Sequence, residues 1–540
     1  MRKKIISGLA AIAMVFGSAA VLPTEVFDTV ITASAEVSTA KSGKLSENIS
    51  WTLDEKGRLT VSGTGDMPDY TYDVAPFADR TDIYTVNINK GITNIGNYVF
   101  FKCPNLVSVT IPDSVTSIGK GAFCKCPGLW DITIPDSVTS IGDSAFRMCS
   151  SLTSIAFPDS VKSIGREAFR DCTNLAAITI TDSCGIEDIG ADAFWVTKWM
   201  EDRCKKDPLV VLNGILINAY YCKGDVTVPD TVRTIGEQAF CDNDSITFVT
   251  IQSGTTKICE HAFLYCDNLT SVTIADGVTT IEKSAFEDCV NLKTVTIPDS
   301  VTSLGASTFR GCKNLTSVNI PSGLTEIESD VFCNCVSLTD VTIPNGVEKI
   351  GFNAFFKCQS LTSVIIPDSV TSISDYAFQR CTKLTSVTIP NSVTNIGFLS
   401  FYDCPNLKSV TIPESVTSIA ELAFGITGDL MAEVKEKVDG FKIYCYKDTK
   451  GEQYAKDNGF DYVIITDRLV GDANGDGKIT ADDAIITARF AAGYGNYKDT
   501  YDPDVCDMNR DGQVTADDAI IIARYAAGYS NYRDTYTNYI

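Results

Sequence analysis

Residues 105–127, NLVSVTIPDSVTSIGKGAFCKCP, are one copy of a unit that recurs through most of the chain. Aligning the copies on the Phe of this unit gives the series Phe100, Phe123, Phe146, Phe169, Phe194, Phe240, Phe263, Phe286, Phe309, Phe332, Phe355, Phe378, Phe401 and Phe424. From Phe240 onward every step is 23 residues, and the 46 residues between Phe194 and Phe240 leave room for one degenerate unit. A fixed period of this length predicts stacked supersecondary units rather than one globular core.

Within the unit, Leu106, Val109 and Ile111 have the spacing of a strand that buries one face. Residues 112–114, Pro-Asp-Ser, predict a turn, because Pro cannot donate to a strand ladder and Asp and Ser bond to nearby backbone. The apolar side chains of residues 115–123 then return the chain over the core. One unit cannot fold alone, but copies stacked about 4.7–4.9 Å apart bury a continuous apolar column. We therefore predict a repeat solenoid with a β-strand and an irregular or short helical return in each unit.

The motif IPDSVTSIG..AF..C stands almost intact at residues 111–126, 134–149 and 366–381. It resembles the BspA-like leucine-rich repeats of bacteria, the Treponema pallidum-type class, over about residues 83–424. The resemblance implies a curved solenoid that serves in adhesion or protein binding. We place the leucine-rich repeats at residues 83–426.

The first 35 residues predict a secretory signal peptide. Residues 2–4 are basic, residues 5–22 are largely apolar, and Ala-Ser-Ala at 33–35 suits cleavage. We therefore expect a secreted, extracellular protein. No second long apolar run follows, so we expect no membrane span in the mature chain. The formal charge of −23 argues against nucleic acid or an anionic membrane as a partner.

Two segments flank the repeats as expected caps. Residues 36–82 predict a β-hairpin cap, because residues 49–53 and 59–61 alternate in polarity about a turn. Residues 427–466 predict a C-terminal cap with a strand, a helical stretch and a second strand. The exposed end of a solenoid needs such a cover.

An irregular unit, residues 195–227, interrupts the repeats and holds two of the four Trp residues. It is either a ligand-binding protrusion or a lengthened repeat, since loops both host function and tolerate insertion. Lengthened repeats are common in the family that the chain resembles.

The chain has twenty cysteines, and eleven of them lie three residues after a repeat Phe. These eleven are Cys103, Cys126, Cys149, Cys172, Cys266, Cys289, Cys312, Cys335, Cys358, Cys381 and Cys404. Because a thiol packs as a small hydrophobe, we predict a buried and reduced cysteine ladder. Bridges between neighbouring rungs remain an alternative, and Cys204 and Cys222 of the irregular unit are the better disulfide candidates.

Residues 472–483, DANGDGKITADD, and 507–518, DMNRDGQVTADD, both match a 12-residue calcium loop. Oxygen ligands stand at positions 1, 3, 5 and 12, a Gly stands at position 6, and position 7 adds a backbone carbonyl. The sequence therefore predicts two Ca²⁺ ions. The expected ligands are Asp472, Asn474, Asp476, Lys478 and Asp483 in the first loop and Asp507, Asn509, Asp511, Gln513 and Asp518 in the second.

Each loop runs directly into a helical sequence, AIITARFAAGY or AIIIARYAAGY. Tandem loop–helix units with Asp at position 12 resemble the type I dockerin of cellulosome proteins, over about residues 470–532. We assign residues 467–540 to this small all-α, EF-hand-like domain. The resemblance implies calcium-dependent docking onto the cohesin module of a scaffoldin. Its implied cohesin contacts are Ala481, Asp482, Arg489, Ala516, Asp517 and Arg524. Because the two halves match closely, we predict that either half can present the same face to the cohesin.

A catalytic site is not expected. His261 is the only His, so a His-rich zinc site cannot form and a nucleophile–His site would have one possible base. Carboxylate-pair glycosidases need no His. The Asp residues of the repeats, such as Asp113 and Asp299, instead recur at one turn position, where a turn-forming role explains them.

The exposed positions of the repeat strands form rows of Ser, Thr and Asn, which are either a solvated sheet face or a binding face for a protein or glycan. Our first hypothesis is a non-catalytic adhesion or binding protein attached to a scaffoldin. The second is a structural spacer of the scaffold. The third is a polysaccharide-degrading component, favoured by the usual company of dockerins and disfavoured by the absence of a recognisable catalytic module.

Overall fold

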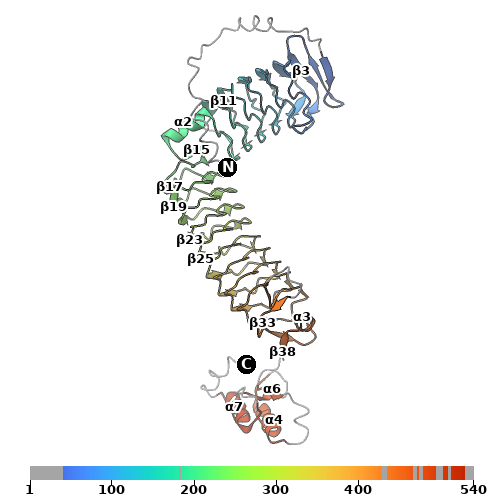
Figure 1. The fold of residues 1–540 in the computed structure, drawn as a ribbon, viewed down its shortest axis with the longest axis vertical. Helices are drawn as coiled ribbons and strands as arrows, with labels where there is room; N and C mark the ends of the chain where they lie inside the picture. Colours follow the sequence, from blue (N-terminus) through green and yellow to red (C-terminus); the bar gives the residue numbers. More distant parts are fainter. Residues whose placement is uncertain are drawn as a thin grey trace. The chain divides into compact units, whose positions relative to one another are not determined.

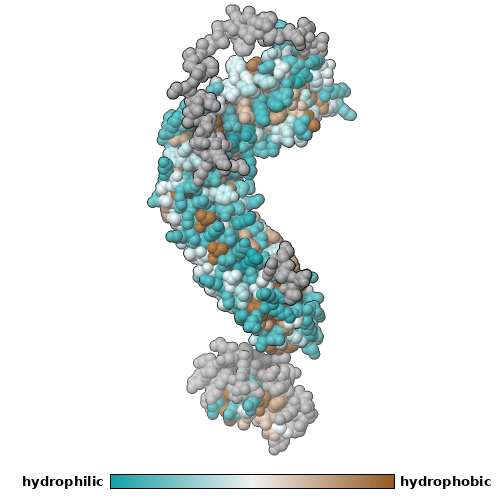
Figure 2. All heavy atoms as spheres, viewed as in Figure 1, coloured by the Kyte–Doolittle hydropathy of each residue, from teal (hydrophilic) through white to brown (hydrophobic). Residues whose placement is uncertain are grey.

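The computed structural model describes residues 41–181, 184–428, 435–465, 471–473, 478–493, 503–508 and 513–528. The chain divides into two compact units with the boundary between Lys442 and Ile443. The first unit is a β-solenoid in which strands are stacked along the chain (Figure 1). Figure 2 shows mostly hydrophilic residues on the visible face of this unit, with scattered hydrophobic ones.

Each regular rung contributes one strand to a long-strand row and a short strand to a second, short-strand row. The long-strand row consists of β1 (Lys41–Lys44), β2 (Ile49–Leu53), β3 (Arg58–Gly63), β5 (Thr85–Ile88), β7 (Ser108–Thr110), β9 (Asp131–Ile132), β11 (Ser154–Phe157), β13 (Ala177–Ile180), β17 (Gly224–Val228), β19 (Ile246–Ile251), β21 (Ser271–Ile274), β23 (Thr294–Thr296), β25 (Ser317–Asn319), β27 (Asp340–Thr342), β29 (Ser363–Ile365), β31 (Ser386–Thr388) and β33 (Ser409–Ile412).

The short-strand row was not part of the sequence expectation. It consists of β4 (Gly65–Asp66), β6 (Ile92–Ile95), β8 (Ser117–Ile118), β10 (Ser140–Ile141), β12 (Ser163–Ile164), β14 (Asp188–Ile189), β15 (Val210–Leu212), β16 (Ile215–Asn218), β18 (Thr234–Ile235), β20 (Lys257–Ile258), β22 (Thr280–Ile281), β24 (Ser303–Leu304), β26 (Glu326–Ile327), β28 (Lys349–Ile350), β30 (Ser372–Ile373), β32 (Asn395–Ile396) and β34 (Ser418–Ile419). A further antiparallel pair, β35 (Ile426–Thr427) and β36 (Glu436–Lys437), follows the last rung.

The strand register equals the sequence period. In the long-strand row Val272 pairs with Val295, and Val295 pairs with Val318. In the short-strand row Ile118 pairs with Ile141. Every pair joins equivalent residues of adjacent repeats. Each buried side chain therefore packs against the side chain at the same position of the next repeat. The 23-residue sequence period is therefore confirmed as the geometric period of a parallel solenoid.

A column of buried Phe rings forms the centre of the core. Adjacent rings of the repeat series are stacked with centroids 4.5–5.8 Å apart and planes within 17°. The column begins at Phe77, one period before Phe100, and this rung was missing from the sequence alignment. The column is interrupted between Phe194 and Phe240, where the irregular unit lies.

The return segment of a regular rung consists of its short strand followed by turns, so the short helices considered from the sequence do not form there. Each rung places two residues in the left-handed region, for example Gly121 (φ 59°) and Lys125 (φ 62°). In these conformations, backbone N–H groups of one rung point toward carbonyl oxygens of the next rung. Phe123 N donates to Ala145 O at 2.8 Å, and Lys125 N donates to Arg147 O at 2.7 Å. The inter-rung bonds offset the cost of placing L-residues in this region.

The cysteine ladder is a hydrogen-bonded element of the core. The Cys126 thiol donates to Phe100 O at 3.2 Å, and the Cys149 thiol repeats this contact with Phe123 O. Burial raises the pKa of Cys172 to about 12. No disulfide joins the cysteines in the described parts of the chain, and Cys204 and Cys222 are both thiols. The reduced ladder is therefore the arrangement that the structure has.

The irregular unit adds a helix and a hairpin to the solenoid. Helix α2 (Lys198–Lys206) begins at Thr197, whose hydroxyl accepts from Met200 N at 3.1 Å. Trp199 packs against Phe194 with ring centroids 5.5 Å apart. Strands β15 and β16 are antiparallel, and β16 then pairs in parallel with β18. The unit is thus built into the core and leads back to regular rungs.

The first unit begins with an antiparallel meander. Strands β2 and β3 form the hairpin expected around residues 54–57, with Trp51 opposite Val61. Strand β1 pairs with β2, and β3 pairs in parallel with β5 of the first rung. The solenoid edge at this end is thereby covered by antiparallel strands.

The second unit begins within β37 (Lys442–Tyr446) and continues with α3 (Lys450–Asn458) and β38 (Asp461–Ile465). These elements confirm the strand–helix–strand pattern expected from the sequence. In the part of this unit that the structure describes, three helices follow: α4 (Ala481–Ala491), α6 (Pro503–Cys506) and α7 (Ala516–Ala526). Helices α4 and α7 pack together around Ala484, Met508 and Ile522. Both end before a left-handed Gly, Gly493 or Gly528, which suits a helix terminus.

Candidate functional sites

The two loop–helix junctions of the second unit have the same geometry. At the start of α4, Thr480 N donates to Asp483 Oδ2 at 2.8 Å, and Asp482 N donates to Thr480 Oγ1 at 3.3 Å. At the start of α7, Thr515 N donates to Asp518 Oδ2 at 2.9 Å. Both junctions are capping boxes with an aspartate at the third helical position. The cap therefore fixes the carboxylate that was predicted to close each calcium loop.

The predicted calcium ligands are only partly within the described residues. Asp472, Asp483 and Asp518 are buried, Asp507 is half-buried, and Lys478 and Gln513 are exposed. The remaining four predicted ligands, Asn474, Asp476, Asn509 and Asp511, lie outside the described residues. The structure therefore gives the ends of each loop but not a complete coordination shell.

The buried ends of the first loop fit a hard cation. Asp472 is 2% exposed and Asp483 is fully buried. A buried carboxylate is costly unless it is paired or coordinates a metal. Carboxylate oxygens are the ligands that Ca²⁺ prefers. The carboxylates at the loop ends therefore fit Ca²⁺, and Thr480 already donates to that of Asp483.

The six predicted cohesin contacts are all exposed. Asp482 and Arg489 are two helical turns apart on α4, and Asp517 and Arg524 have the same relation on α7, so each pair lies on one helix face. Two further exposed side chains on these helices were not predicted from the sequence: Ile485 on α4 and its equivalent on α7, Ile520, which are 49% and 46% exposed. Both lie three residues after the aspartate of the pair, and that helical spacing was the available signal.

The exposed face of the long-strand row contains a shallow groove of about 520 Å³ over β23, β25 and β27. Thr294, Thr296, Ser317 and Thr342 line it together with Asn319. The Asn319 side chain bridges to the preceding rung, since its Oδ1 accepts from Ile297 N at 3.0 Å and its Nδ2 donates to Ile297 O. The predicted rows of hydroxyls are therefore real, and they form a slightly hollowed surface.

The exposed face of the long-strand row is less uniform than the predicted rows of Ser, Thr and Asn. Asp340 occupies the position of Ser317 in the next strand and is exposed. Ile365 follows in the position of Thr342 and is 73% exposed. An uncharged polar lattice is therefore interrupted on β27 and β29.

One group in the described part of the chain brings three potential metal ligands together: Glu237, Glu260 and His261, whose ligand atoms lie within 4.8 Å of one another. The guanidinium of Arg166 contacts both carboxylates, at 3.0 Å from Glu260 Oε2. Glu237 Oε2 also accepts from Ala191 N at 3.1 Å. Burial raises the pKa of Glu237. We interpret this group as an ion-pair link between the rungs on either side of the irregular unit.

The stacked 23-residue rungs with buried Leu, Ile and Phe define a leucine-rich repeat protein. The family model described as "BspA type Leucine rich repeat region (6 copies)" matches residues 75–200, 218–339 and 325–451. The chain therefore belongs to this family. A second model, "Dockerin type I domain", matches residues 470–526.

Solved structures of bacterial leucine-rich repeat proteins are similar to this chain. One from Eubacterium ventriosum shares 26% identity with a TM-score of 0.37, covering 66% of this chain and 93% of that chain. One from Bacteroides ovatus shares 25% identity with a TM-score of 0.36, covering 68% and 94%. A leucine-rich cell surface protein from Faecalibacterium prausnitzii shares 25% identity with a TM-score of 0.31, covering 64% and 94%. The comparison with curated proteins returns no match.

The dockerin implies a cohesin as a partner and association with a cellulosome, and type I dockerins are calcium-binding domains. Among the helices of the described residues, none has the length and apolar character needed to cross a membrane.

Proposed function

We propose that this protein is a secreted, non-catalytic binding protein that docks onto a cohesin of a scaffoldin through its dockerin and holds a protein or glycan on its repeat face. The observation that carries the proposal is the presence, in one chain, of a long strand face and two equivalent capped loop–helix junctions. A face built of repeated rungs offers contact area, and a paired loop–helix domain offers attachment.

Calcium dependence follows from the residues at the junctions. The ten oxygen-bearing positions predicted from the sequence would hold two ions, and bound Ca²⁺ would supply positive charge to the buried carboxylates at the loop ends. Thr480 and Thr515 hold the last carboxylate of each loop at the start of its helix. Calcium binding and the orientation of α4 and α7 are therefore coupled.

Either helix can present the cohesin-binding face. On α4 this face consists of Asp482, Ile485 and Arg489. On α7 it consists of the equivalent residues in the second half of the dockerin, Asp517, Ile520 and Arg524. An exposed isoleucine between an acidic and a basic side chain gives each face an apolar centre with a charged rim. We infer that the two faces bind the same cohesin in two orientations.

Cohesin binding tests the attachment. The full chain is titrated against a panel of type I cohesins by calorimetry, with Ca²⁺ and then with a chelator. We expect binding with Ca²⁺ and at least a hundredfold loss without it. Ile485→Ala alone is expected to leave binding nearly intact, because α7 remains, while Ile485→Ala with Ile520→Ala is expected to abolish it. Binding that survives chelation contradicts the calcium role, and loss in the single variant contradicts the two orientations.

Retention on surfaces tests the role of the repeats. The full chain, docked to a cohesin, is incubated with cellulose, xylan, pectin and bacterial cells. Retention that depends on the repeat face supports the binding role. Absence of retention on every surface favours a structural spacer, and release of soluble sugar favours a polysaccharide-degrading component.

A further inference from the structure

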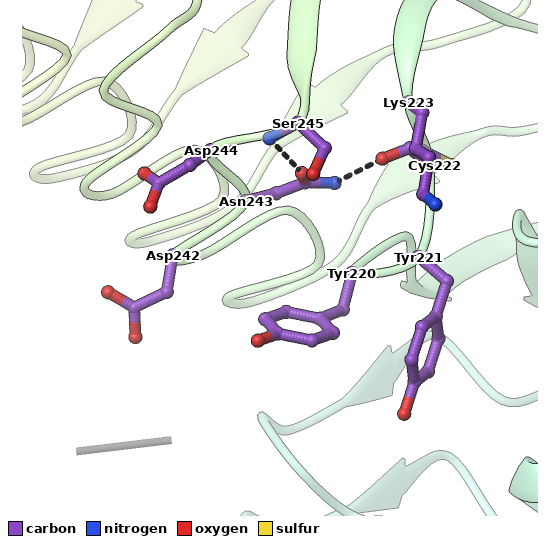
Figure 3. A pocket seen from close by; sticks show the side chains of 8 residues that line it. All are labelled: Tyr220, Tyr221, Cys222, Lys223, Asp242, Asn243, Asp244 and Ser245. Carbon is purple, nitrogen blue, oxygen red and sulfur yellow. Dashed lines mark hydrogen bonds between the residues drawn. The ribbon is translucent and has the colours of Figure 1, made fainter. Parts of the chain in front are cut away.

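The irregular unit and the rung that follows it form a hollow of about 170 Å³ that is lined by two tyrosines and two aspartates. Its lining residues are Tyr220, Tyr221, Cys222, Lys223, Asp242, Asn243, Asp244 and Ser245 (Figure 3). In Figure 3 the two carboxylates project to the same side, and the Tyr220 hydroxyl points toward that side. The hollow is therefore aromatic on one part of its wall and acidic on another.

The floor of the hollow is built by a residue that departs from the repeat pattern. Asn243 stands three residues after a repeat Phe, where regular rungs have the ladder Cys. Its Nδ2 donates to Ala219 O at 3.0 Å and to Cys222 O at 3.1 Å, and its Oδ1 accepts from Ser245 N at 2.9 Å. Asn243 is 2% exposed, so these bonds are shielded from water. The hollow is pre-formed by a buried hydrogen-bond network.

The aromatic rings are arranged at right angles to one another. Trp195 and Tyr220 have ring centroids 6.0 Å apart with planes at 81°. Tyr220 and Tyr221 follow at 5.3 Å and 88°, and Tyr221 is 49% exposed. Of these three rings, Tyr220 and Tyr221 line the hollow, and their perpendicular planes form a corner at which a compact group can meet both. This geometry suits a small cation, which is attracted to the negative faces of aromatic rings.

The charge of Asp242 points to the same ligand. Aspartates occupy this position, two residues after the repeat Phe, in other rungs. There Asp171 is paired with Arg147 at 3.7 Å, and Asp403 with Arg380 at 3.5 Å. Asp242 makes no ion pair within the described chain. It therefore offers a negative charge on the wall of the hollow that no arginine of the repeat neutralises.

From this corner of rings and the uncompensated carboxylate, we propose that the hollow at Tyr220, Tyr221 and Asp242 binds an alkylammonium group, such as the side chain of a lysine or methyl-lysine on a partner protein. The ring faces attract the cation, and Asp242 and Asp244 supply the opposite charge. The proposal deepens the binding role given to the repeats and rests on it. It places a specific ligand site where the irregular unit meets the following rung, apart from the strand face.

Tetramethylammonium chloride is the probe, titrated into the full chain by calorimetry at constant ionic strength and constant Ca²⁺. We expect saturable binding, and binding at least tenfold weaker for neopentyl alcohol, a neutral molecule of similar shape. Tyr220→Leu is expected to weaken binding about 2–30-fold, because a cation–aromatic contact is lost. Asp242→Asn is expected to weaken it about 2–5-fold.

Three further variants keep the result specific. Tyr72→Leu and Asp276→Asn remove an exposed tyrosine and an exposed aspartate elsewhere, and binding should not change. Lys223→Met removes the positive charge that lines the hollow and should tighten binding. Equal binding of the neutral probe, stronger binding of cellobiose than of the cation, or unchanged binding in Tyr220→Leu overturns the proposal. Cohesin binding by the same samples reports separately on the attachment role, so the two can fail independently.

Discussion

The Phe column predicts how the solenoid loses its structure when one ring is removed. Phe309 is fully buried and stacks on Phe286 at 5.5 Å and on Phe332 at 5.8 Å. In Phe309→Ala both stacks are lost and a cavity forms, which costs about 3–5 kcal/mol of unfolding free energy. The matched control Phe352→Ala removes a ring that is 43% exposed and has one edge contact, with Tyr376, so its cost is about 1 kcal/mol.

The stability of a repeat stack is approximately a sum over neighbouring rungs, so the loss should stay local. The four tryptophans, Trp51, Trp130, Trp195 and Trp199, all precede Phe309 in the chain. Their fluorescence therefore reports on the first half of the solenoid, whereas far-UV circular dichroism reports on all of it. In urea titrations of Phe309→Ala, we expect the dichroism to show an early transition while the fluorescence midpoint stays close to that of the parent protein.

Phe352→Ala, the control, should show a much smaller loss of unfolding free energy and no comparable early transition in the dichroism. If Phe309→Ala moved both midpoints together, the solenoid would unfold as one cooperative unit and the nearest-neighbour reasoning would be refuted. If Phe309→Ala cost no more than Phe352→Ala, the stacked column would not be the main source of stability.

Three other outcomes follow from single residues. Thr480→Ala should destabilise the start of α4 by about 1 kcal/mol and weaken calcium affinity, as measured by competition with a fluorescent chelator. The ion pair with Arg80 lowers the pKa of Asp82 to about 2, so its stabilising contribution is complete above about pH 4 and is lost as the pH falls toward 2. Asp82→Asn should remove this part of the acid sensitivity in pH-dependent urea titrations. Burial raises the pKa of Cys172 to about 12 and that of the less buried Cys204 to about 11, so alkylation followed by mass spectrometry should label Cys204 first; the reverse order would contradict the burial assigned to the ladder.

Periodicity made the regular rungs predictable because register and period are the same quantity in this fold. Once Val272, Val295 and Val318 are equivalent in sequence, stacking places them opposite each other, and no long-range information is needed. Phe77 was missed because its rung lacks the rest of the motif, although its distance from Phe100 is one period. The short-strand row was missed because two-residue strands have too few side chains to show alternation.

The aromatic hollow could not be predicted from the same rule, because it depends on how a non-repeating segment packs. Tyr220 and Asp242 belong to different rungs, and the bonds of Asn243 add to the backbone bonds that join their segments. One signal was nevertheless in the sequence. Of the fourteen positions three residues after a repeat Phe, three lack the ladder Cys: Thr197, at the start of the irregular unit, Asn243, in the first rung after it, and Thr427, at the end of the repeats. A thiol can satisfy one carbonyl of the neighbouring rung, whereas Thr197 caps a helix and Asn243 holds three backbone groups. Where a solenoid exchanges its repeating small hydrophobe for a side chain with more hydrogen bonds, the backbone nearby must have left the repeating path, and this is where an individual ligand site can form.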